Sequence, residues 1–490
     1  MTRSRFNWLI VTTLCAIAFF AGLGRAPVGR IQEARVLETA REMLKSGDFI
    51  LPRMNAEPRL QKAPLAYWLA AGGYSVGGHA GEAEGRFYSA AAGTLGALLL
   101  LAYGSFMGRR QAGFWAALIL VTSRLWLRHS RLAETDVLLS LTIAGALLAL
   151  FVAFDQPGGA RRLMWLFIGW AGMAAAVLAK GPAVVSLPLL TALVCAVAHR
   201  GRSGLRVLFH PFACLLFLAL VTPWFLLVTL REEMAPGVFW HELAVTASGA
   251  SHGHDLPYSL FYYLLRVWPD FGPWSLLLPF VVSAAVRAFR SDSFVRFSVL
   301  WIIAMLCQLE VVGSRQPHYL LPVLPGLALL TGWWLAERAQ PVWRRLAACV
   351  IPLPVAVALF LAFGGDRLVQ PEHFARRDFA LAIDPLVRGR PLWIYGRADP
   401  ILCFYLKRTI PEATIGDLRD RLGSEGSLLV LMTVDFRAPE ATIEEAIPGV
   451  RQELLAGQKL KPHESVFLYR LTKEQPRKAI RATGHPRLQG

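Results

Sequence analysis

Cysteine is scarce in this sequence. Only 6 of its 490 residues are cysteine, and they are scattered, most of them within apolar runs. No two of them have the spacing of a zinc site, and there is no pattern of a disulfide framework. The sequence therefore does not belong to the small disulfide-stapled or zinc-organised classes of protein.

Acidic residues are also few. The chain has 34 Asp and Glu against 51 Lys and Arg, a formal net charge of +17. Such an excess can indicate a nucleic-acid partner, so the positions of the basic residues matter more than their sum. Together with Arg3 and Arg5, they fall on every second connection between apolar runs, in these groups: Arg109 and Arg110; Arg161 and Arg162; Arg200, Arg202 and Arg206; Arg287, Arg290 and Arg296; Arg338, Arg344 and Arg345. This alternation is the positive-inside pattern, and it explains much of the charge without nucleic acid.

Long apolar runs are abundant. Hydrophobic residues make up 55% of the chain, and runs of about 20 residues, enough to cross roughly 30 Å of hydrocarbon, recur along it. The sequence predicts a polytopic α-helical membrane protein of about 11 spans. We expect these spans at residues 8–24, 87–107, 114–127, 136–154, 163–179, 183–198, 207–230, 274–288, 297–312, 319–336 and 346–364. A cleaved signal peptide is the alternative for the first run, but its loss would break the alternation of charges.

Two long polar loops, residues 25–86 and 231–273, then lie on the outer side, within a membrane domain of residues 1–365. In the first loop, Val36, Leu37 and Ala40 recur at helical spacing while charged residues take the opposite face. Glu33 in the first turn and Gly47 after the last suit the two ends of a helix. We expect this helix to lie at the membrane surface, followed by a short amphipathic piece at residues 65–76.

The character of the chain changes at residue 366. Charges and turn residues mix with short β-rich runs at residues 391–395, 427–433 and 467–471, and helical patterns occur near residues 399–407 and 415–422. We predict an extramembrane, periplasmic α/β domain over residues 366–475. The basic tail, residues 476–490, is expected to be disordered.

Several motifs occur in an order that is more specific than any one of them: QEARVLETAREMLKSGDFILPRMNAEPRLQKAPLAYW, SRLAETDVLL, LAKGPAVVSLPLL, SHGHDLPYSLFYYL and SRQPHYLLPVLPGLALL. Across residues 7–335 the sequence resembles the lipid-linked-sugar glycosyltransferases of the GT-C fold. It is most similar to the branch of the 4-amino-4-deoxy-L-arabinose lipid A transferases, and more distantly to protein O-mannosyltransferases. The resemblance implies an inverting glycosyltransferase of the bacterial inner membrane, with a cytoplasmic N-terminus. Its expected partners are an undecaprenyl-phosphate sugar donor, membrane lipids, and an acceptor such as lipid A, another glycolipid, a polysaccharide or a protein.

Two carboxylates are the catalytic candidates. Asp136 stands at an outer helix start beside Glu134 and Thr135, where a helix cap is the alternative role. Glu33 matches the Glu of the family's Asp-Glu pair, and its alternative role is to stabilise the helix dipole. If Asp136 is only a cap, its replacement by Asn should leave transfer unchanged.

Four further residues are candidates for binding the substrate phosphate. Lys62 and Arg59 carry cationic groups that can neutralise a departing phosphate, although basic side chains at an interface also extend toward lipid headgroups. Arg315 and Tyr319 match the family's late signature, and the alternative for Arg315 is an anchor at the end of a span.

The sequence departs from the family's pattern at Gln32 and Gln61, where the family has Asp before Glu and Glu before Lys. An amide can still bind substrate by hydrogen bonds, but it cannot act as a base or as an anionic metal ligand. His252 and His254 are metal-ligand candidates, and polar loop residues are their alternative. We therefore expect no cofactor and little effect of chelators.

Two other functions remain open at this stage. A transporter or flippase of lipid-linked sugars would bury polar sites near the bilayer midplane and often carry inverted repeats. In this chain the polar residues gather in the outer loops, and we find no internal repeat. A pseudoenzyme that binds the donor without transferring the sugar stays possible because of Gln32 and Gln61.

Overall fold

The computed structural model describes residues 3–248, 261–312, 315–435, 450–461 and 463–473. It divides into two compact units, residues 1–371 and 372–490. The predicted tail and the pair His252 and His254 lie outside the described residues, so their predictions are untested.

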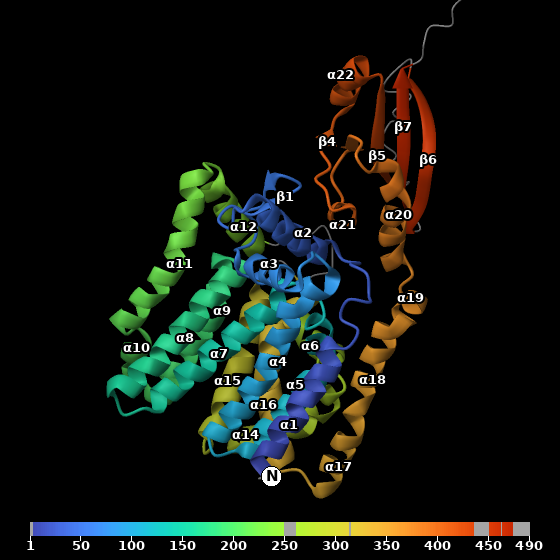
Figure 1. Cartoon of the computed structure of the whole chain (residues 1–490). Coiled ribbons are helices and arrows are strands. Elements are labelled where there is room, and N and C mark those ends of the chain that lie inside the picture. Colours follow the sequence, from blue (N-terminus) through green and yellow to red (C-terminus); the bar gives the residue numbers. More distant parts are fainter. Residues whose placement is uncertain (1–2, 249–260, 313–314, 436–449, 462, 474–490) are drawn as a thin grey trace, which may run out of the picture. The chain divides into compact units, whose positions relative to one another are not determined.

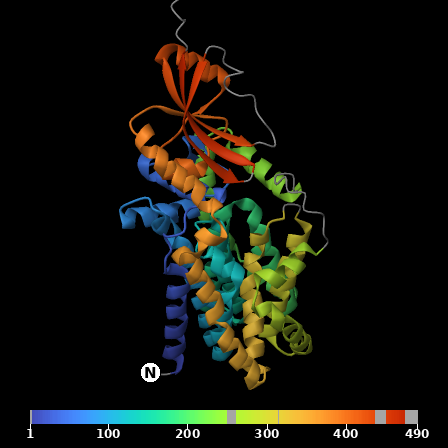
Figure 2. The same cartoon turned by 90° about the vertical axis from the view of Figure 1, so that its right-hand side faces the viewer.

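The first unit is a helical bundle (Figures 1 and 2), in which α2 and α3 lie at the same end. Its α-helices are α1 (Arg3–Cys15), α2 (Ile31–Ser46), α3 (Leu65–Gly77), α4 (Glu82–Phe106), α5 (Arg110–Thr122), α6 (Arg124–His129), α7 (Thr135–Asp155), α8 (Gly159–Lys180), α9 (Ser186–Arg200), α10 (Arg202–Leu208), α11 (Pro211–Arg231), α12 (Ala235–Ser248), α13 (Tyr262–Asp270), α14 (Leu278–Ala288), α15 (Ser293–Val311), α16 (Leu324–Glu337), α17 (Pro341–Val350), α18 (Pro352–Phe360) and α19 (Asp366–Val369). Short π and 3-10 turns lie at η1 (Ala16–Phe20), η2 (Pro182–Val185), η3 (Trp274–Leu277), η4 (Pro317–Val323) and η5 (Leu361–Gly365), and a small hairpin pairs β1 (Arg53–Met54) with β2 (Glu57–Pro58).

In the part of the chain that the structure describes, 8 helical runs are long and apolar enough to cross a membrane, and a bent pair, Tyr262–Asp270 with Trp274–Ala288, brings the number to 9. The eight are Glu82–Phe106, Thr135–Asp155, Gly159–Lys180, Pro182–Arg200, Pro211–Arg231, Ser293–Val311, Pro317–Glu337 and Pro341–Val369. The polytopic helical architecture is thus confirmed. Among the predicted spans, the run at 8–24 corresponds to a shorter apolar helix, Ser4–Phe20. The run at 114–127 is divided between α5, which has 13 residues, and α6.

Burial separates the centre of the bundle from its edge. The apolar stretch of α7 is 83% buried and that of Pro317–Glu337 is 89% buried, whereas that of Pro211–Arg231 is 17% buried.

The central helices approach one another closely at glycine residues. A Cβ placed on Gly104 of α4 would lie 2.4 Å from the Cα of Gly113 in α5, and one on Gly332 of α16 would lie 2.6 Å from the carbonyl oxygen of Ala112. Small residues allow this backbone-to-backbone packing, which favours helix association in lipid.

Helix α2 has the predicted apolar face and ends at Ser46, followed by Gly47 as the C-cap with a φ of +71°. Two carboxylates on its charged face are nevertheless buried within the protein. Glu38 is 0% exposed and pairs with Arg41 at 2.5 Å, and Glu42 accepts hydrogen bonds from the backbone N–H groups of Asn55 and Ala56 at 2.6 and 3.0 Å. Buried carboxylates are tolerated here because each has donors to satisfy it.

The second unit is an α/β fold around one five-stranded sheet of order β4-β3-β5-β7-β6. Its elements are α20 (Glu372–Val387), β3 (Leu392–Tyr395), α21 (Pro400–Leu406), β4 (Glu412–Ala413), α22 (Ile415–Glu425), β5 (Ser427–Asp435), β6 (Val450–Lys461) and β7 (Glu464–Lys473). Strand β3 pairs parallel with β4 and β5, and β7 pairs antiparallel with β5 and β6. The three predicted strands and two predicted helices are present, and the sequence missed α20, β4 and β6.

Candidate active site

A cavity of about 550 Å³ lies in the first unit. Its walls are largely apolar, from residues that include Leu139, Leu187, Leu190, Phe225, Phe239, Val311 and Pro322. Its polar lining includes Gln61, Lys62, Asp136, Lys180, Glu242, His318 and Tyr319. A cavity with apolar walls and a few convergent polar groups is the form that ligand sites usually take.

Lys62 reaches this cavity from the turn before α3. Its neighbours Leu60 and Ala63 are buried in a hydrophobic cluster with Trp224 and Ala235, which fixes the turn. The ammonium of Lys62 lies 3.8 Å from the carboxylate of Glu242, and both side chains are about one-third exposed. Burial, and after it the charge of Lys180, holds the pKa of Lys62 below its usual value.

Asp136 and Lys180 form a second, tighter ion pair. Asp136 is the second residue of α7 and Lys180 is the last of α8, and Lys180 Nζ donates to Asp136 Oδ1 at 2.5 Å. Both side chains are about one-tenth exposed. The residue at the N-cap position of α7 is Glu134, and no side chain caps this helix, so the alternative role of Asp136 as a cap is wrong.

The Lys180 ammonium also contacts one aromatic ring. It lies 4.3 Å from the centre of the Tyr319 ring, a cation–π contact. His318 Nε2 lies 4.0 Å from the same Asp136 oxygen. Asp136, Lys180, His318 and Tyr319 therefore form one connected group at the polar end of the cavity.

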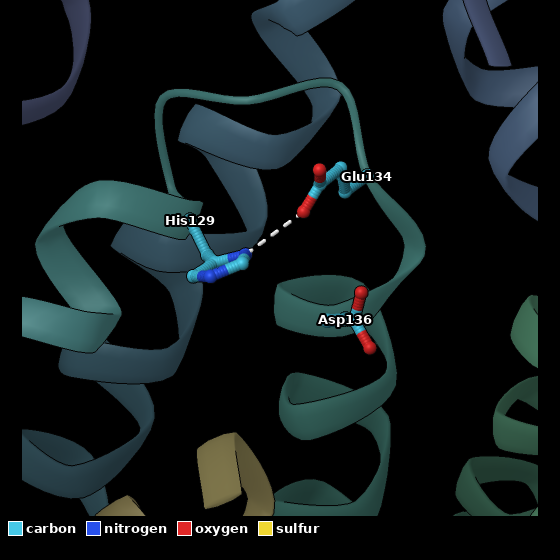
Figure 3. A group of neighbouring side chains, drawn as sticks. All are labelled: His129, Glu134 and Asp136. Carbon is cyan, nitrogen blue, oxygen red and sulfur yellow. Dashed lines mark ion pairs between the residues drawn. The ribbon is translucent and has the colours of Figure 1, made fainter. Parts of the chain in front are cut away.

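A second layer lies behind Asp136 (Figure 3). His129 at the end of α6 and Glu134 in the following turn point toward each other, with His129 Nδ1 3.0 Å from Glu134 Oε2. Glu134 also pairs with Arg30 at 3.2 Å. Burial alone would raise the pKa of the Glu134 carboxyl, but the hydrogen bond and charge of His129 and the charge of Arg30 outweigh it, so this pKa lies below its usual value.

His129, Glu134 and Asp136 each offer an atom within 4.8 Å of the others, close enough to share a metal ion. However, each carboxylate already has a cationic partner, Arg30 for Glu134 and Lys180 for Asp136. A metal ion would have to compete with these charges. We therefore interpret the group as part of a charge-balanced network, in which Arg30 pairs with Glu134 and Lys180 with Asp136.

The structure places Gln61, Lys62, Asp136 and Tyr319, four of the predicted site residues, on the cavity. Glu33 does not line it. Its carboxylate accepts from Arg86 Nε at 2.7 Å and from the backbone N–H of Ala133 at 3.0 Å, and it is 0% exposed.

The other three predicted residues also lie outside the cavity lining. Gln32 is exposed on the first turn of α2. Arg59 is buried, with its Nε 3.2 Å from the hydroxyl of Tyr67. Arg315 donates to the backbone carbonyl of Glu310 at 3.3 Å.

Sequence reasoning missed Lys180, His318 and Glu242. Lys180 stands directly before the Gly-Pro break between two spans, in the motif LAKGPAVVSLPLL, within which we predicted no site residue. His318 precedes Tyr319 in the late signature, and Glu242 stands in the second long loop. Their positions in family motifs or outer loops could have marked them as candidates. Their spacing in the sequence could not show that all three side chains line one cavity.

Comparison with known proteins shows what the chain is similar to. Residues 61–226 match the family described as dolichyl-phosphate-mannose-protein mannosyltransferase. The chain is 29% identical over 366 residues to an uncharacterised protein of Aquifex aeolicus, covering 73% of this chain and 70% of that protein. It is 29% identical over 360 residues to the undecaprenyl phosphate-alpha-4-amino-4-deoxy-L-arabinose arabinosyl transferase of Pectobacterium carotovorum subsp. carotovorum, covering 72% of this chain and 62% of that enzyme.

Solved structures with the same fold cover nearly the whole chain. ArnT from Cupriavidus metallidurans bound to undecaprenyl phosphate superposes with a TM-score of 0.80 at 21% identity, over 94% of this chain and 98% of that one. The oligosaccharyltransferase of Archaeoglobus fulgidus gives a TM-score of 0.53 at 11% identity, over 89% of this chain and 70% of that one. This chain is therefore a multi-span membrane protein with a GT-C-like fold, and it is similar to the branch of the 4-amino-4-deoxy-L-arabinose transferases, as its motifs predicted.

Proposed function

We propose that this protein is an inverting membrane glycosyltransferase that moves a sugar from a polyprenyl phosphate, such as undecaprenyl phosphate, to an acceptor at the membrane. The observation that carries the proposal is the placement of Lys62 and Lys180 at the polar end of a cavity with apolar walls. Apolar walls suit a prenyl chain, and ammonium groups stabilise the negative charge that develops on a departing phosphate.

The proposed reaction is a displacement at the anomeric carbon. The acceptor oxygen provides the electron pair for the new bond, the bond from the anomeric carbon to the phosphate oxygen breaks, and its electron pair stays on the lipid phosphate. We assign stabilisation of this phosphate to Lys62 and Lys180, and orientation of the reacting groups to Asp136. A hydroxyl acceptor also gives up a proton, for which Asp136 is the proposed base. A phosphate acceptor, as on lipid A, is already anionic and needs no base.

We further propose that the N-terminus is cytoplasmic and that loops 25–86 and 231–273 and the C-terminal unit are periplasmic. The alternation of arginine groups along the sequence supports this orientation, because Lys and Arg in short loops resist translocation. The cavity then opens at the periplasmic end of the bundle, where Lys62 and Glu242 come from the two long outer loops.

The test is a transfer assay with purified full-length protein in detergent. Undecaprenyl-phosphate 4-amino-4-deoxy-L-arabinose and lipid A are supplied, and the products are identified by mass spectrometry, with and without EDTA. We expect a lipid A product heavier by one sugar residue, formed equally well with EDTA. Absence of product, together with unchanged envelope lipids in a deletion strain, would contradict the proposed function.

The same assay also compares the natural protein with the variant Gln32→Asp. If the natural protein is an active enzyme, Gln32→Asp should change the rate little, because Gln32 does not line the cavity. A large gain in rate would instead indicate a weakened enzyme or a donor-binding pseudoenzyme.

A further inference from the structure

We propose that Glu242 is an internal competitor of the lipid phosphate: its carboxylate pairs with Lys62 when the cavity holds no phosphate and promotes release of the phosphate product. This inference rests on the proposed function and concerns the same cavity. It assigns a role to a residue that the transfer chemistry described above does not use.

The position of Glu242 is set by the packing of α12. Phe239, one helical turn earlier, contacts the rings of Phe225 and Trp224 at centroid distances of 5.1 and 6.1 Å. Phe239 and Glu242 both line the cavity, as expected for residues three positions apart on one helix face. The aromatic contact therefore directs the Glu242 carboxylate toward Lys62.

The two ion pairs of the cavity differ in kind. Lys180 and Asp136 are in hydrogen-bond contact at 2.5 Å and are about one-tenth exposed. Lys62 and Glu242 are 3.8 Å apart, beyond hydrogen-bond distance, and are about one-third exposed. A pair of this second kind is weak and opens at little cost. Lys62 is thus the cation that can exchange its carboxylate for a phosphate.

The charge of the ligand changes during the proposed reaction. The donor is a phosphodiester with one negative charge. When the bond to the anomeric carbon breaks, its electron pair remains on the phosphate, and the product is a phosphate monoester with up to two negative charges. The two lysines, Lys62 and Lys180, and the two carboxylates, Asp136 and Glu242, give the polar lining of the cavity a net charge near zero. A competing carboxylate at Lys62 therefore opposes retention of the more highly charged product.

The experiment measures binding of farnesyl monophosphate to the purified full-length protein in detergent. Removing the competing charge in Glu242→Gln should tighten binding by up to about fivefold, the size expected when a weak, partly exposed pair no longer has to open. Glu233→Gln is the matched control, because Glu233 is exposed on the segment before α12 and does not line the cavity. We expect this control to bind like the wild type. Equal or weaker binding by Glu242→Gln would overturn the proposal.

A second measurement shows whether Glu242 acts through Lys62. In a Lys62→Gln background, the further change Glu242→Gln should no longer tighten binding, because the competition has no target. Tightening of the same size in both backgrounds would overturn the proposed pairing. In turnover, Glu242→Gln should be inhibited by lower concentrations of added farnesyl monophosphate than the wild type.

These outcomes separate the two proposals. If the wild type does not bind farnesyl monophosphate at all, the proposed function fails at the donor site. If the wild type binds it and transfers sugar, but Glu242→Gln binds no more tightly, only the role of Glu242 is wrong.

Discussion

Asp136 is a residue whose charge serves both stability and the proposed chemistry. Asp136→Asn should lower transfer by about 100-fold or more, because a positioned acid–base group is lost. It should also destabilise the protein by about 3–5 kcal/mol, since Lys180 is left buried without its counter-ion. Thermal unfolding in detergent and the transfer assay measure the two effects separately.

The double variant Asp136→Asn with Lys180→Met removes both charges and is the control for folding. It should recover stability but not transfer. Near wild-type transfer by either variant would show that Asp136 has no catalytic role.

Lys62 gives the proposed phosphate site a distinctive pH dependence. A lysine is cationic below its pKa and neutral above it. Burial and the charge of Lys180, with a smaller part from Arg59, lower the pKa of Lys62, while the carboxylates of Glu242 and Asp136 oppose them. Affinity for farnesyl monophosphate should therefore fall at a lower pH than the usual lysine pKa of about 10.4 would give.

Lys62→Arg should remove this alkaline loss, because arginine stays charged over the whole range. The affinities of the wild type and Lys62→Arg are compared at several values between about pH 7 and pH 10. An identical decline in both would mean that another group controls binding.

Among the single residues predicted from the sequence, Lys62, Asp136 and Tyr319 line the cavity, whereas Glu33 does not. The reason is that residue type and motif position indicate chemistry, whereas a pairing such as Glu33 with Arg86 joins residues far apart in the sequence. The same limit explains why Glu242 was not singled out, since its partner lies in the other outer loop.

Among the elements, α2 is held to the bundle by a buried ion pair. Arg86 of α4 donates to Glu33 and also to the carbonyl oxygens of Leu23, Ala26 and Pro27. Glu33→Gln should lower the unfolding temperature, because Arg86 keeps its charge and loses its counter-ion. Transfer per folded molecule should change little. Full stability with lost transfer would instead support the catalytic role that the sequence predicted for Glu33.

Helical periodicity predicted the elements well where one face is apolar and the other is open. It identified α2 and α3, whereas apolar length identified the long spans and β-rich composition identified the strands β3, β5 and β7. It could not show that further protein covers the charged face of α2, because a pattern along one helix contains no information about a second layer. The strand β4 is only two residues long, too short for a period to be recognised.

For the whole molecule, orientation in the membrane is the main open prediction. A reporter active only in the periplasm, fused after residue 370, should be active, because the arginine groups place that position outside. The matched control is the same reporter fused after residue 160, beside Arg161 and Arg162, which should be inactive. An inactive reporter at both positions would mean that the number of crossings between residues 160 and 370 is wrong by one. The reverse pattern at both would mean that the number before residue 160 is wrong by one or that the N-terminus is periplasmic.

The glycine contacts among α4, α5 and α16 have a consequence for genetics. A side chain at Gly104 or Gly332 would meet backbone atoms, which cannot move aside as a flexible side chain can. A loss-of-function screen should therefore identify these positions as strongly as the residues of the cavity, although they touch no ligand. Separating the two classes needs a measurement of protein abundance beside one of transfer, because glycine variants should disappear from the membrane while cavity variants remain there and stay inactive.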